Sequence, residues 1–215
     1  MLKKLIDNCR MPRGFIGGII VSLMNVGHAP LIRKGLEQSS LAPGQTVLDI
    51  GCGGGCAVDI MARRGTRVFG VDISPVSVRK SRRKNRKHIK AGKASIDLSG
   101  VDSLAFPPET FDLVTAFETV YFWANIRDNF RQVHEMLKPG GEFFIALEAY
   151  KENGRINNVP SVFLKLDMNV YSAEELMEML RGAGFSAISH MKEKDGKKLY
   201  VSAVKRREEP DRVAA

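Results

Sequence analysis

The sequence predicts a doubly wound α/β fold, in which helices cover both faces of a mostly parallel sheet. Short apolar, strand-like runs alternate with helical patterns along residues 47–147, which is the order expected of βαβ units. The run at residues 111–117 is almost continuously apolar, as in a strand that is buried on both faces. A length of 215 residues and a hydrophobic content of 44% predict one soluble domain with a sizeable core.

The first predicted strand, residues 47–50, leads into a glycine-rich turn. It follows the turn residues Pro43 and Gly44, and Gly51, Gly53 and Gly55 come directly after it, before a helix at residues 58–64. Glycine has no Cβ, so its backbone can adopt positive φ and let a ligand lie directly against it. A purely structural turn between strand and helix is the alternative.

The spacing of the three glycines distinguishes between possible ligands. A dinucleotide fingerprint, Gly-x-Gly-x-x-Gly/Ala, would place its last small residue at Cys56. Here the third glycine comes one position earlier, and Asp49 stands two residues before Gly51. We expect Asp49 to orient the turn and to attract a ligand's ammonium group. A dinucleotide oxidoreductase is therefore only a minor alternative.

The second predicted strand, residues 66–71, ends at Asp72, about 20 residues after the first glycine. A carboxylate at that strand tip can accept hydrogen bonds from both hydroxyls of a ribose. The alternative role, a helix N-cap, is already supplied by Ser74 in front of Pro75. We therefore predict that Asp72 binds ribose.

The next helix, predicted for residues 75–91, is strongly basic. Residues 79–90 contain eight Lys or Arg and no acid, in a chain whose formal net charge is +9. Such a stripe can be an electrostatic footprint for nucleic acid, acidic protein or a membrane. No aromatic residue interleaves with the charges, so we favour a solvated outer helix.

The rest of the core continues the alternation. Strands are predicted at residues 94–98, 111–117 and 142–147, with a helix from Ile126 to Leu137 that ends at Lys138-Pro139-Gly140-Gly141. Residues 148–171 show neither helical nor strand periodicity. So long a loop is more often a substrate lid than a connection without function. A helix capped by Ser172 follows, and residues 185–191 and 198–204 then form a hairpin around Asp195-Gly196.

The two ends of the chain lie outside this core, which we place at residues 41–205. Residues 1–40 are predicted to form a helical cap whose apolar face, at residues 15–16, 19–20 and 23–24, is buried. The apolar run at residues 15–26 is shorter than the roughly 20 residues of a spanning helix, and contact with a membrane surface is a minor alternative. Residues 206–215 form a charged tail. The three cysteines lack zinc-type pairing, so we expect no metal site, reduced thiols and a cytoplasmic location.

Taken together, these motifs resemble those of a known family. Asp49 to Gly55, Asp72, the run FPPETFDLVTAFETVYFW and the run VHEMLKPGGEFFI are similar to class I methyltransferases of the methyltransferase-domain 11 or 25 group. The resemblance implies a Rossmann-like, seven-stranded sheet whose last strand is antiparallel. It also implies S-adenosylmethionine as cofactor and S-adenosylhomocysteine as product.

The resemblance also assigns cofactor-binding positions. They are Asp49, Gly51, Cys52, Gly53, Gly55, Asp72, Ile73, Gly100, Val101, Asp102, Phe117 and Glu118. One position departs from the family pattern: Gly100-Val101 stands where an Asp-Ala pair often reaches adenine, and Asp102 is a possible substitute. The sequence after residue 117 also lacks the Asn-Pro-Pro-Tyr signature of enzymes that methylate amino groups of DNA adenine or of glutamine.

The acceptor is the least determined part of the prediction. Methyl transfer from a sulfonium mainly needs alignment, and a base only where the nucleophile must lose a proton. His28, Glu118 and Tyr121 are candidates for a catalytic role, and Tyr121 and Trp123 for the acceptor pocket, with ordinary packing as the alternative for each. A small-molecule acceptor is favoured over a nucleic-acid methyltransferase that uses residues 79–90, and over a non-catalytic nucleotide-binding protein. The oligomeric state is left open.

Overall fold

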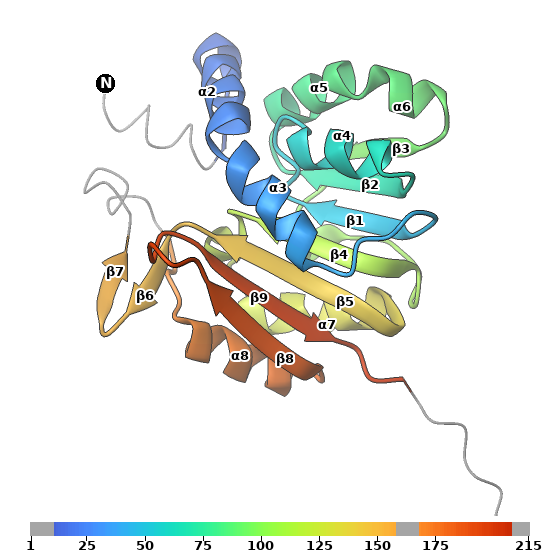
Figure 1. The fold of residues 1–215 in the computed structure, drawn as a ribbon. Helices are drawn as coiled ribbons and strands as arrows, with labels where there is room; N and C mark the ends of the chain where they lie inside the picture. Colours follow the sequence, from blue (N-terminus) through green and yellow to red (C-terminus); the bar gives the residue numbers. More distant parts are fainter. Residues whose placement is uncertain (1–10, 158–167, 208–215) are drawn as a thin grey trace, which may run out of the picture.

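A single seven-stranded sheet organises the chain (Figure 1). The structure, a computed structural model, describes residues 11–157 and 168–207. The strands lie in the order β3-β2-β1-β4-β5-β9-β8, and β9 is antiparallel to both of its neighbours while the other pairs are parallel. Their bounds are β1 Thr46–Ile50, β2 Arg67–Asp72, β3 Ala94–Leu98, β4 Phe111–Phe117, β5 Leu137–Leu147, β8 Ser186–Lys192 and β9 Leu199–Val204. The predicted sheet and its antiparallel last strand are thus confirmed.

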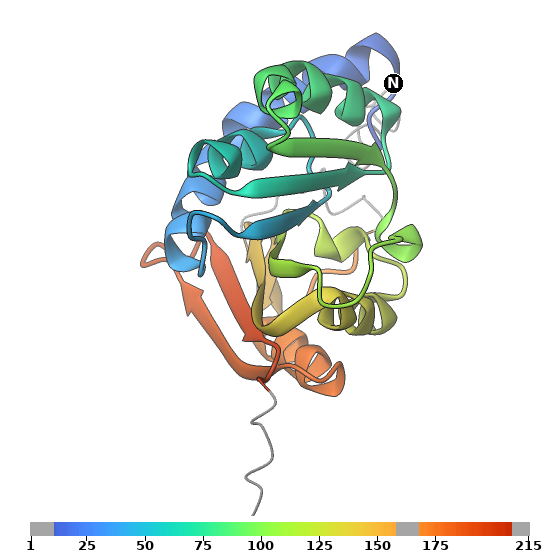
Figure 2. The ribbon, with the colours of Figure 1, turned by 90° about the vertical axis from the view of Figure 1, so that its right-hand side faces the viewer.

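Helices cover both faces of this sheet (Figures 1 and 2). One face carries α3 (Ala29–Gln38), α4 (Cys56–Arg63) and α5 (Pro75–Lys84), and the other carries α7 (Ile126–Met136) and α8 (Ala173–Gly182). The first described helix, α2 (Gly14–Gly27), packs against α5, and α6 (Arg86–Lys90) follows α5. Two short 3-10 turns, η1 (Val101–Ser103) and η2 (Val120–Phe122), follow β3 and β4.

The central strands bury side chains on both faces, which explains why their sequences are apolar throughout. On β4, Leu113 and Phe117 point into the core under α3 and α4, whereas Val114 and Ala116 point into the core under α7 and α8. Burying a residue of this size stabilises a fold by roughly 1.5–3 kcal/mol. A buried parallel strand therefore cannot show the polar and apolar alternation of a surface strand.

The parallel arrangement brings several strand ends to one edge of the sheet. β1 lies between β2 and β4, so the chain crosses to one side after β1 and to the other side after β3. In open α/β sheets the crevice at such a reversal, beyond the carboxyl ends of the strands, is where ligands bind. The residues after β1, β2 and β4 meet there.

The prediction of a single basic helix over residues 75–91 is wrong. The helix breaks at Asn85, which is buried and separates α5 from α6. The side-chain Nδ2 of Asn85 donates to the carbonyl oxygens of Gly55 at 3.1 Å and Ser81 at 3.0 Å. Asn85 thereby connects the end of α5 to the glycine turn. The helical periodicity of the sequence cannot predict such a tertiary contact.

The segment predicted as a loop without secondary structure, residues 148–171, contains a hairpin. β6 (Tyr150–Glu152) and β7 (Arg155–Asn157) pair antiparallel around Asn153 and Gly154, both at positive φ. An Asn-Gly pair with two positive φ values is a favoured two-residue hairpin turn. Residues 158–167 lie outside the described residues, so the lid role of this segment stays a prediction.

The apolar face predicted to be buried on the N-terminal helix is only partly buried. Ile20 and Val21 are buried, whereas Ile16, Ile19 and Leu23 are exposed. Within the described ranges, α2 packs with one side against α5, α3 and, through Asn25, the glycine turn, and its other side is left exposed. In the described part of the chain no single helix has the length and apolarity to cross a membrane. α2 from Ile16 and α3, bent by 47° at their junction, meet the length and composition test only as a pair.

The predicted helical cap, the predicted charged tail and the boundaries of the predicted core stay predictions. Residues 1–10 of the predicted cap and residues 208–215 of the predicted tail fall outside the described ranges. α3 packs against α4 and β5 as a layer of the core, so the helical segment before residue 41 is closely joined to the sheet.

Candidate functional site

The glycine turn after β1 has the backbone that its sequence requires. Gly51, Gly53 and Gly55 have φ values of 77°, 53° and 79°, in the left-handed region that side chains disfavour. A Cβ on Gly51 would lie 2.5 Å from Oγ1 of Thr119, which follows β4. The turn is therefore closed against the neighbouring strand end, and its backbone forms the floor of the site.

Replacing Gly51 by alanine is expected to lower the free energy of unfolding by about 2–4 kcal/mol, from left-handed strain plus the clash with Thr119. The matched control is Gly154→Ala. Gly154 has a φ of +75°, but a Cβ added there would meet no atom of the described residues within 4 Å. That control should lose only about 1 kcal/mol. Urea denaturation of both variants measures the difference, and equal losses would show that the contact with Thr119 is unimportant.

Asp72 is held at the tip of β2 by two backbone groups. Its Oδ2 accepts from the N–H of Gly53 at 2.9 Å, and its Oδ1 accepts from the N–H of Ser74 at 2.8 Å. Burial raises the pKa of this carboxyl, and the two backbone hydrogen bonds oppose the rise. A carboxylate has about four acceptor positions, so both oxygens keep capacity for a ligand's hydroxyls. Ser74 accepts from the N–H of Ser77 and is the N-cap of α5, as predicted.

Asp49 is a buried carboxyl beneath the turn. Thr115 donates its hydroxyl to Oδ1 of Asp49 at 2.8 Å. Burial raises the pKa of Asp49 to about 7, with a further contribution from the negative charge of Asp72. A buried group of this kind is stabilised by a neighbouring cation, and Asp49 lines the same cleft as Asp72.

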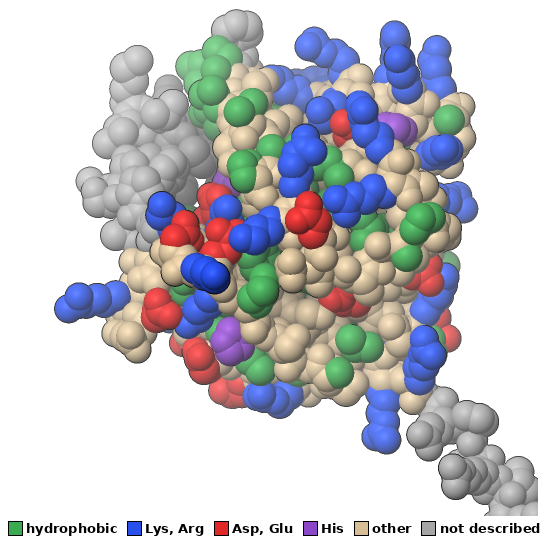
Figure 3. Space-filling view, viewed as in Figure 1, with side chains coloured by type: hydrophobic (Ala, Val, Ile, Leu, Met, Phe, Trp, Pro, Cys, Tyr) green, Lys and Arg blue, Asp and Glu red, His purple; other side chains and the backbone are tan. Residues whose placement is uncertain are grey.

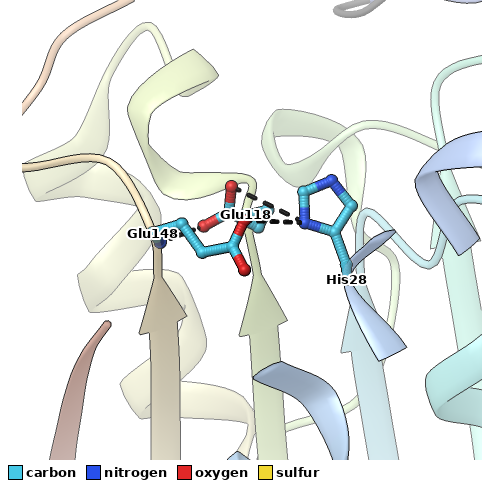
Figure 4. Close-up of side chains that lie close together, drawn as sticks. All are labelled: His28, Glu118 and Glu148. Atoms are coloured by element: carbon cyan, nitrogen blue, oxygen red, sulfur yellow. Dashed lines mark hydrogen bonds and ion pairs between the residues drawn. The ribbon is translucent and has the colours of Figure 1, made fainter. Parts of the chain in front are cut away.

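A second cluster lies at the ends of β4 and β5, next to the end of α2 (Figure 4). The Nδ1 atom of His28 is 3.8 Å from Oε2 of Glu118 and 3.7 Å from Oε2 of Glu148. Glu118 has a φ of +57°, an uncommon value for a residue with a side chain. Its carboxylate accepts from the hydroxyl of Tyr121 at 2.8 Å and from the N–H of Glu148. Backbone strain at a strand end is typical of functional sites.

The electrostatics of this cluster favour a positive charge between the two glutamates. Burial raises the pKa of Glu118, while His28 lowers it. The ligand atoms of His28, Glu118 and Glu148 all lie within 4.8 Å of one another, a separation that a divalent cation can also bridge. The Nδ1 atom of His28 is buried without a hydrogen-bond partner among the described residues. A metal ion at this point, or the imidazolium that forms when His28 takes up a proton, would balance the two carboxylates.

The adenine end of the predicted site lies beyond β3. Val101 is buried, and Ile73 is 45% exposed and faces the same cleft. A Cβ on Gly100 would meet Ile73 at 3.1 Å. Asp102, the possible substitute for the family's acid, accepts from Nδ2 of Asn129 at 2.7 Å. That bond anchors Asp102 to α7, and no other described side chain donates to its second oxygen.

Most of the predicted site residues line one open cleft of about 1300 Å³, solvent at its mouth included. The predicted residues found there are His28, Asp49, Gly51, Cys52, Gly53, Asp72, Ile73, Gly100, Val101, Asp102, Phe117, Glu118 and Trp123. Gly55 and Tyr121 do not line the cleft. The carbonyl oxygen of Gly55 accepts from Asn85 behind the turn, and the hydroxyl of Tyr121 donates to Glu118. Their cofactor and acceptor roles, like those of the lining residues, stay predictions.

Several lining residues had no signal in the sequence. Met24 and Asn25 come from α2, and Thr119 comes from the segment after β4. A Cβ on Gly54 would lie 2.1 Å from Nδ2 of Asn25, so α2 lies directly on the glycine turn. Glu148 was also missed, because it follows β5 in a segment interpreted only as a lid.

Comparisons with known proteins show the family to which the chain belongs. A family model described as a methyltransferase domain matches residues 28–190. The ubiquinone biosynthesis O-methyltransferase of Pseudomonas paraeruginosa is 31% identical over 149 residues, which are 67% of this chain and 56% of that protein. The O-methyltransferase resE of Aspergillus sclerotiorum is 28% identical over 77% of this chain and 64% of its own length. The aligned region therefore spans little more than half of the first of these relatives.

The fold comparison gives the same result. A crystal structure of a SAM-dependent methyltransferase from Aquifex aeolicus superposes with a TM-score of 0.70 at 20% identity, covering 87% of this chain and 97% of that one. Its likeness concerns the fold, whereas the family model covers the glycine turn, Asp72 and the strand ends that form the cleft. On these grounds the chain belongs to the methyltransferase-domain family of class I, S-adenosylmethionine-dependent methyltransferases.

Proposed function

We propose that the chain transfers the methyl group of S-adenosylmethionine to a hydroxyl group of a small-molecule acceptor. The observation that carries this proposal is the cleft itself, in which the glycine turn and Asp72 lie together with His28 and Glu118 of the His28–Glu118–Glu148 cluster. The first part suits a nucleoside with an attached amino acid, and the second suits an acceptor that must lose a proton. Two relatives are named O-methyltransferases, which supports oxygen as the atom methylated.

The cofactor end of the cleft fits the proposed ligand in three places. Asp72 presents a fixed carboxylate for the ribose hydroxyls. Asp49, buried below the turn with a raised pKa, suits the ammonium of the methionine part. Ile73 and Val101 offer apolar walls for the adenine. When bound, the sulfonium supplies an activated methyl carbon.

The acceptor end provides a base and groups that orient it. The two glutamates face Nδ1 of His28, and Figure 4 shows the other ring nitrogen turned away from both of them. Carboxylates on one side of an imidazole favour the proton on that side, so the far nitrogen is the one able to accept a proton. In this arrangement His28 removes the hydroxyl proton, and Glu118 and Glu148 position the ring and stabilise its charge.

A nucleic-acid acceptor is less well supported by the surface. Two of the basic side chains on α5, Arg82 and Lys84, are paired with acids. Arg82 donates to the carbonyl oxygen of Ile96 at 2.8 Å and lies 3.4 Å from Asp97, and Lys84 lies 3.8 Å from Asp59. These pairs neutralise two of the eight positive charges of residues 79–90, and no aromatic side chain stands among those charges to stack on bases.

Calorimetry with S-adenosylhomocysteine tests the proposal. We expect binding to the wild type and about tenfold or greater weakening in Asp72→Ala, since charge-assisted hydrogen bonds of roughly 1.5–3 kcal/mol each are removed. Asp195→Ala, at an exposed turn, is the control and should bind as the wild type does. Binding of NADH in place of S-adenosylhomocysteine would contradict the proposal.

Catalysis is tested separately, by formation of S-adenosylhomocysteine with a panel of phenols and catechols. Transfer to a hydroxylated member of the panel is the expected result. Methylation of RNA or DNA that falls steeply with salt would instead favour the nucleic-acid alternative.

A further inference from the structure

The outer side of α2 is an apolar stripe exposed to solvent. Ile16, Ile19, Leu23 and Val26 are 57%, 47%, 66% and 76% exposed. Their spacing of three and four residues places them on one narrow face of the helix. Isolated apolar residues on a surface are ordinary, but four in line form a contiguous patch that indicates an interaction site. We call these four residues the α2 stripe.

The charge that borders the α2 stripe is positive. Between Arg13 and Arg33 the sequence has no charged residue. The neighbouring helix is α5, whose Lys80 extends across to the hydroxyl of Ser22. Arg79 and Arg83 on the same helix are exposed. Figure 3 shows hydrophobic side chains gathered over α2 and Lys and Arg side chains over α5 and α6, on the same upper side of the molecule.

We propose that the α2 stripe and the basic side of α5 together dock on a membrane surface that contains anionic lipid. Amphipathic helices bind such surfaces by inserting their apolar side chains below the headgroups while nearby Lys and Arg attract the anionic lipids. Each basic residue near the surface adds to the attraction of the anionic lipids. A bilayer that contains anionic lipid offers an apolar interior for the α2 stripe and negative charge for the basic side chains of α5.

The basic side chains beside the stripe argue against a second copy of this chain as the occupant. Such a dimer would bring the two basic helices close together. Like charges at close range oppose such an association.

Docking through this surface has a consequence for the cleft. The opposite side and the end of α2 line the cleft through Val21, Met24, Asn25 and His28. One wall of the cleft would therefore lie at the lipid surface. This consequence rests on the proposed function, whereas the docking itself does not.

Vesicle co-sedimentation of the full chain, without cofactor, tests the proposal. Wild-type protein should bind vesicles of phosphatidylglycerol and phosphatidylcholine, and should bind pure phosphatidylcholine at least about tenfold more weakly. Leu23→Glu/Val26→Glu should lower binding to the anionic vesicles about tenfold or more. The matched control is Ile156→Glu/Met191→Glu, two residues that are 40% and 38% exposed on other elements, and it should bind as the wild type does.

A second pair of variants tests the cationic flank. Arg79→Glu/Arg83→Glu should also reduce binding, whereas Arg181→Glu/Lys197→Glu, which changes the net charge equally at exposed positions elsewhere, should reduce it much less. Circular dichroism confirms that each variant is folded. Equal binding to neutral and anionic vesicles, or unchanged binding in Leu23→Glu/Val26→Glu, would overturn the proposal. So would a wild-type dimer that the stripe variant converts to monomer without any vesicle affinity, because the stripe would then be a protein interface.

Discussion

Replacing His28 by alanine is expected to lower kcat by about 100-fold to 10,000-fold, the usual contribution of general acid–base catalysis. The reason is that His28 is the proton acceptor of the proposed reaction, held by Glu118 and Glu148 at 3.8 and 3.7 Å. Affinity for S-adenosylhomocysteine should change little, because Asp72 and the glycine turn carry cofactor binding in our proposal. The measurement is steady-state kinetics with the best phenol of the panel, alongside calorimetry with S-adenosylhomocysteine.

Imidazole added to the His28→Ala variant provides the decisive control. His28 is 24% exposed and lines the cleft, so a free imidazole can enter and should restore part of kcat. Glu148→Gln should lower kcat less than His28→Ala does, because Glu148 acts only by positioning the ring. His190→Ala, an exposed histidine on β8, should be as active as the wild type. A loss of activity in His28→Ala that comes with an equal loss of cofactor affinity would contradict the assignment.

Chelation separates the proton-transfer role from the metal-binding alternative. If His28, Glu118 and Glu148 act through proton transfer, EDTA should leave kcat within about twofold of its original value, since no Lewis acid is involved. Loss of activity with EDTA and its return with magnesium or manganese would show instead that the three groups hold a divalent cation. The phenol assay with and without added metal is sufficient for this test.

The sequence was informative where function or topology constrains the backbone locally. Gly51, Gly53 and Gly55 could be identified because only glycine takes their positive φ values readily. Asp72 could be placed because its separation from the turn is set by one strand, one helix and a second strand. The apolar run of β4 reports burial on both faces, and the Asp195-Gly196 turn reports the antiparallel pairing of β8 and β9.

The remaining features depend on tertiary contacts, which the periodicity of the sequence does not reveal. Asn85 ends α5 because it reaches the carbonyl of Gly55, 30 residues earlier in the chain. Glu148 joins His28 and Glu118 only because β5 lies next to β4 in the sheet. The exposure of the α2 stripe could not be predicted either. An amphipathic pattern shows which side chains share a face, but not whether another element covers that face.

Replacing Asp49 by asparagine is expected to stabilise the fold and weaken cofactor binding at the same time. The pKa of Asp49 is about 7 in the folded chain against an ordinary 3.8, so the folded state holds this proton more tightly than the unfolded state does. The contribution of this tightly held proton to the free energy of unfolding is full below about pH 4 and is lost as the pH rises through 7. At pH 8 the wild type therefore bears the cost of a buried charge, which asparagine avoids.

The expected gain is about 1–3 kcal/mol in the free energy of unfolding at pH 8, and near zero at pH 4. It is smaller than the whole pKa difference would give, because the amide nitrogen of asparagine also needs a hydrogen-bond partner. Urea denaturation at the two pH values measures it, with Asp195→Asn as the exposed control. Affinity for S-adenosylhomocysteine should fall about tenfold or more, since the carboxylate that attracts the ammonium is gone. A variant that is less stable than the wild type at both pH values would show that Asp49 serves mainly to hold Thr115, and an unchanged affinity would remove Asp49 from the cofactor site.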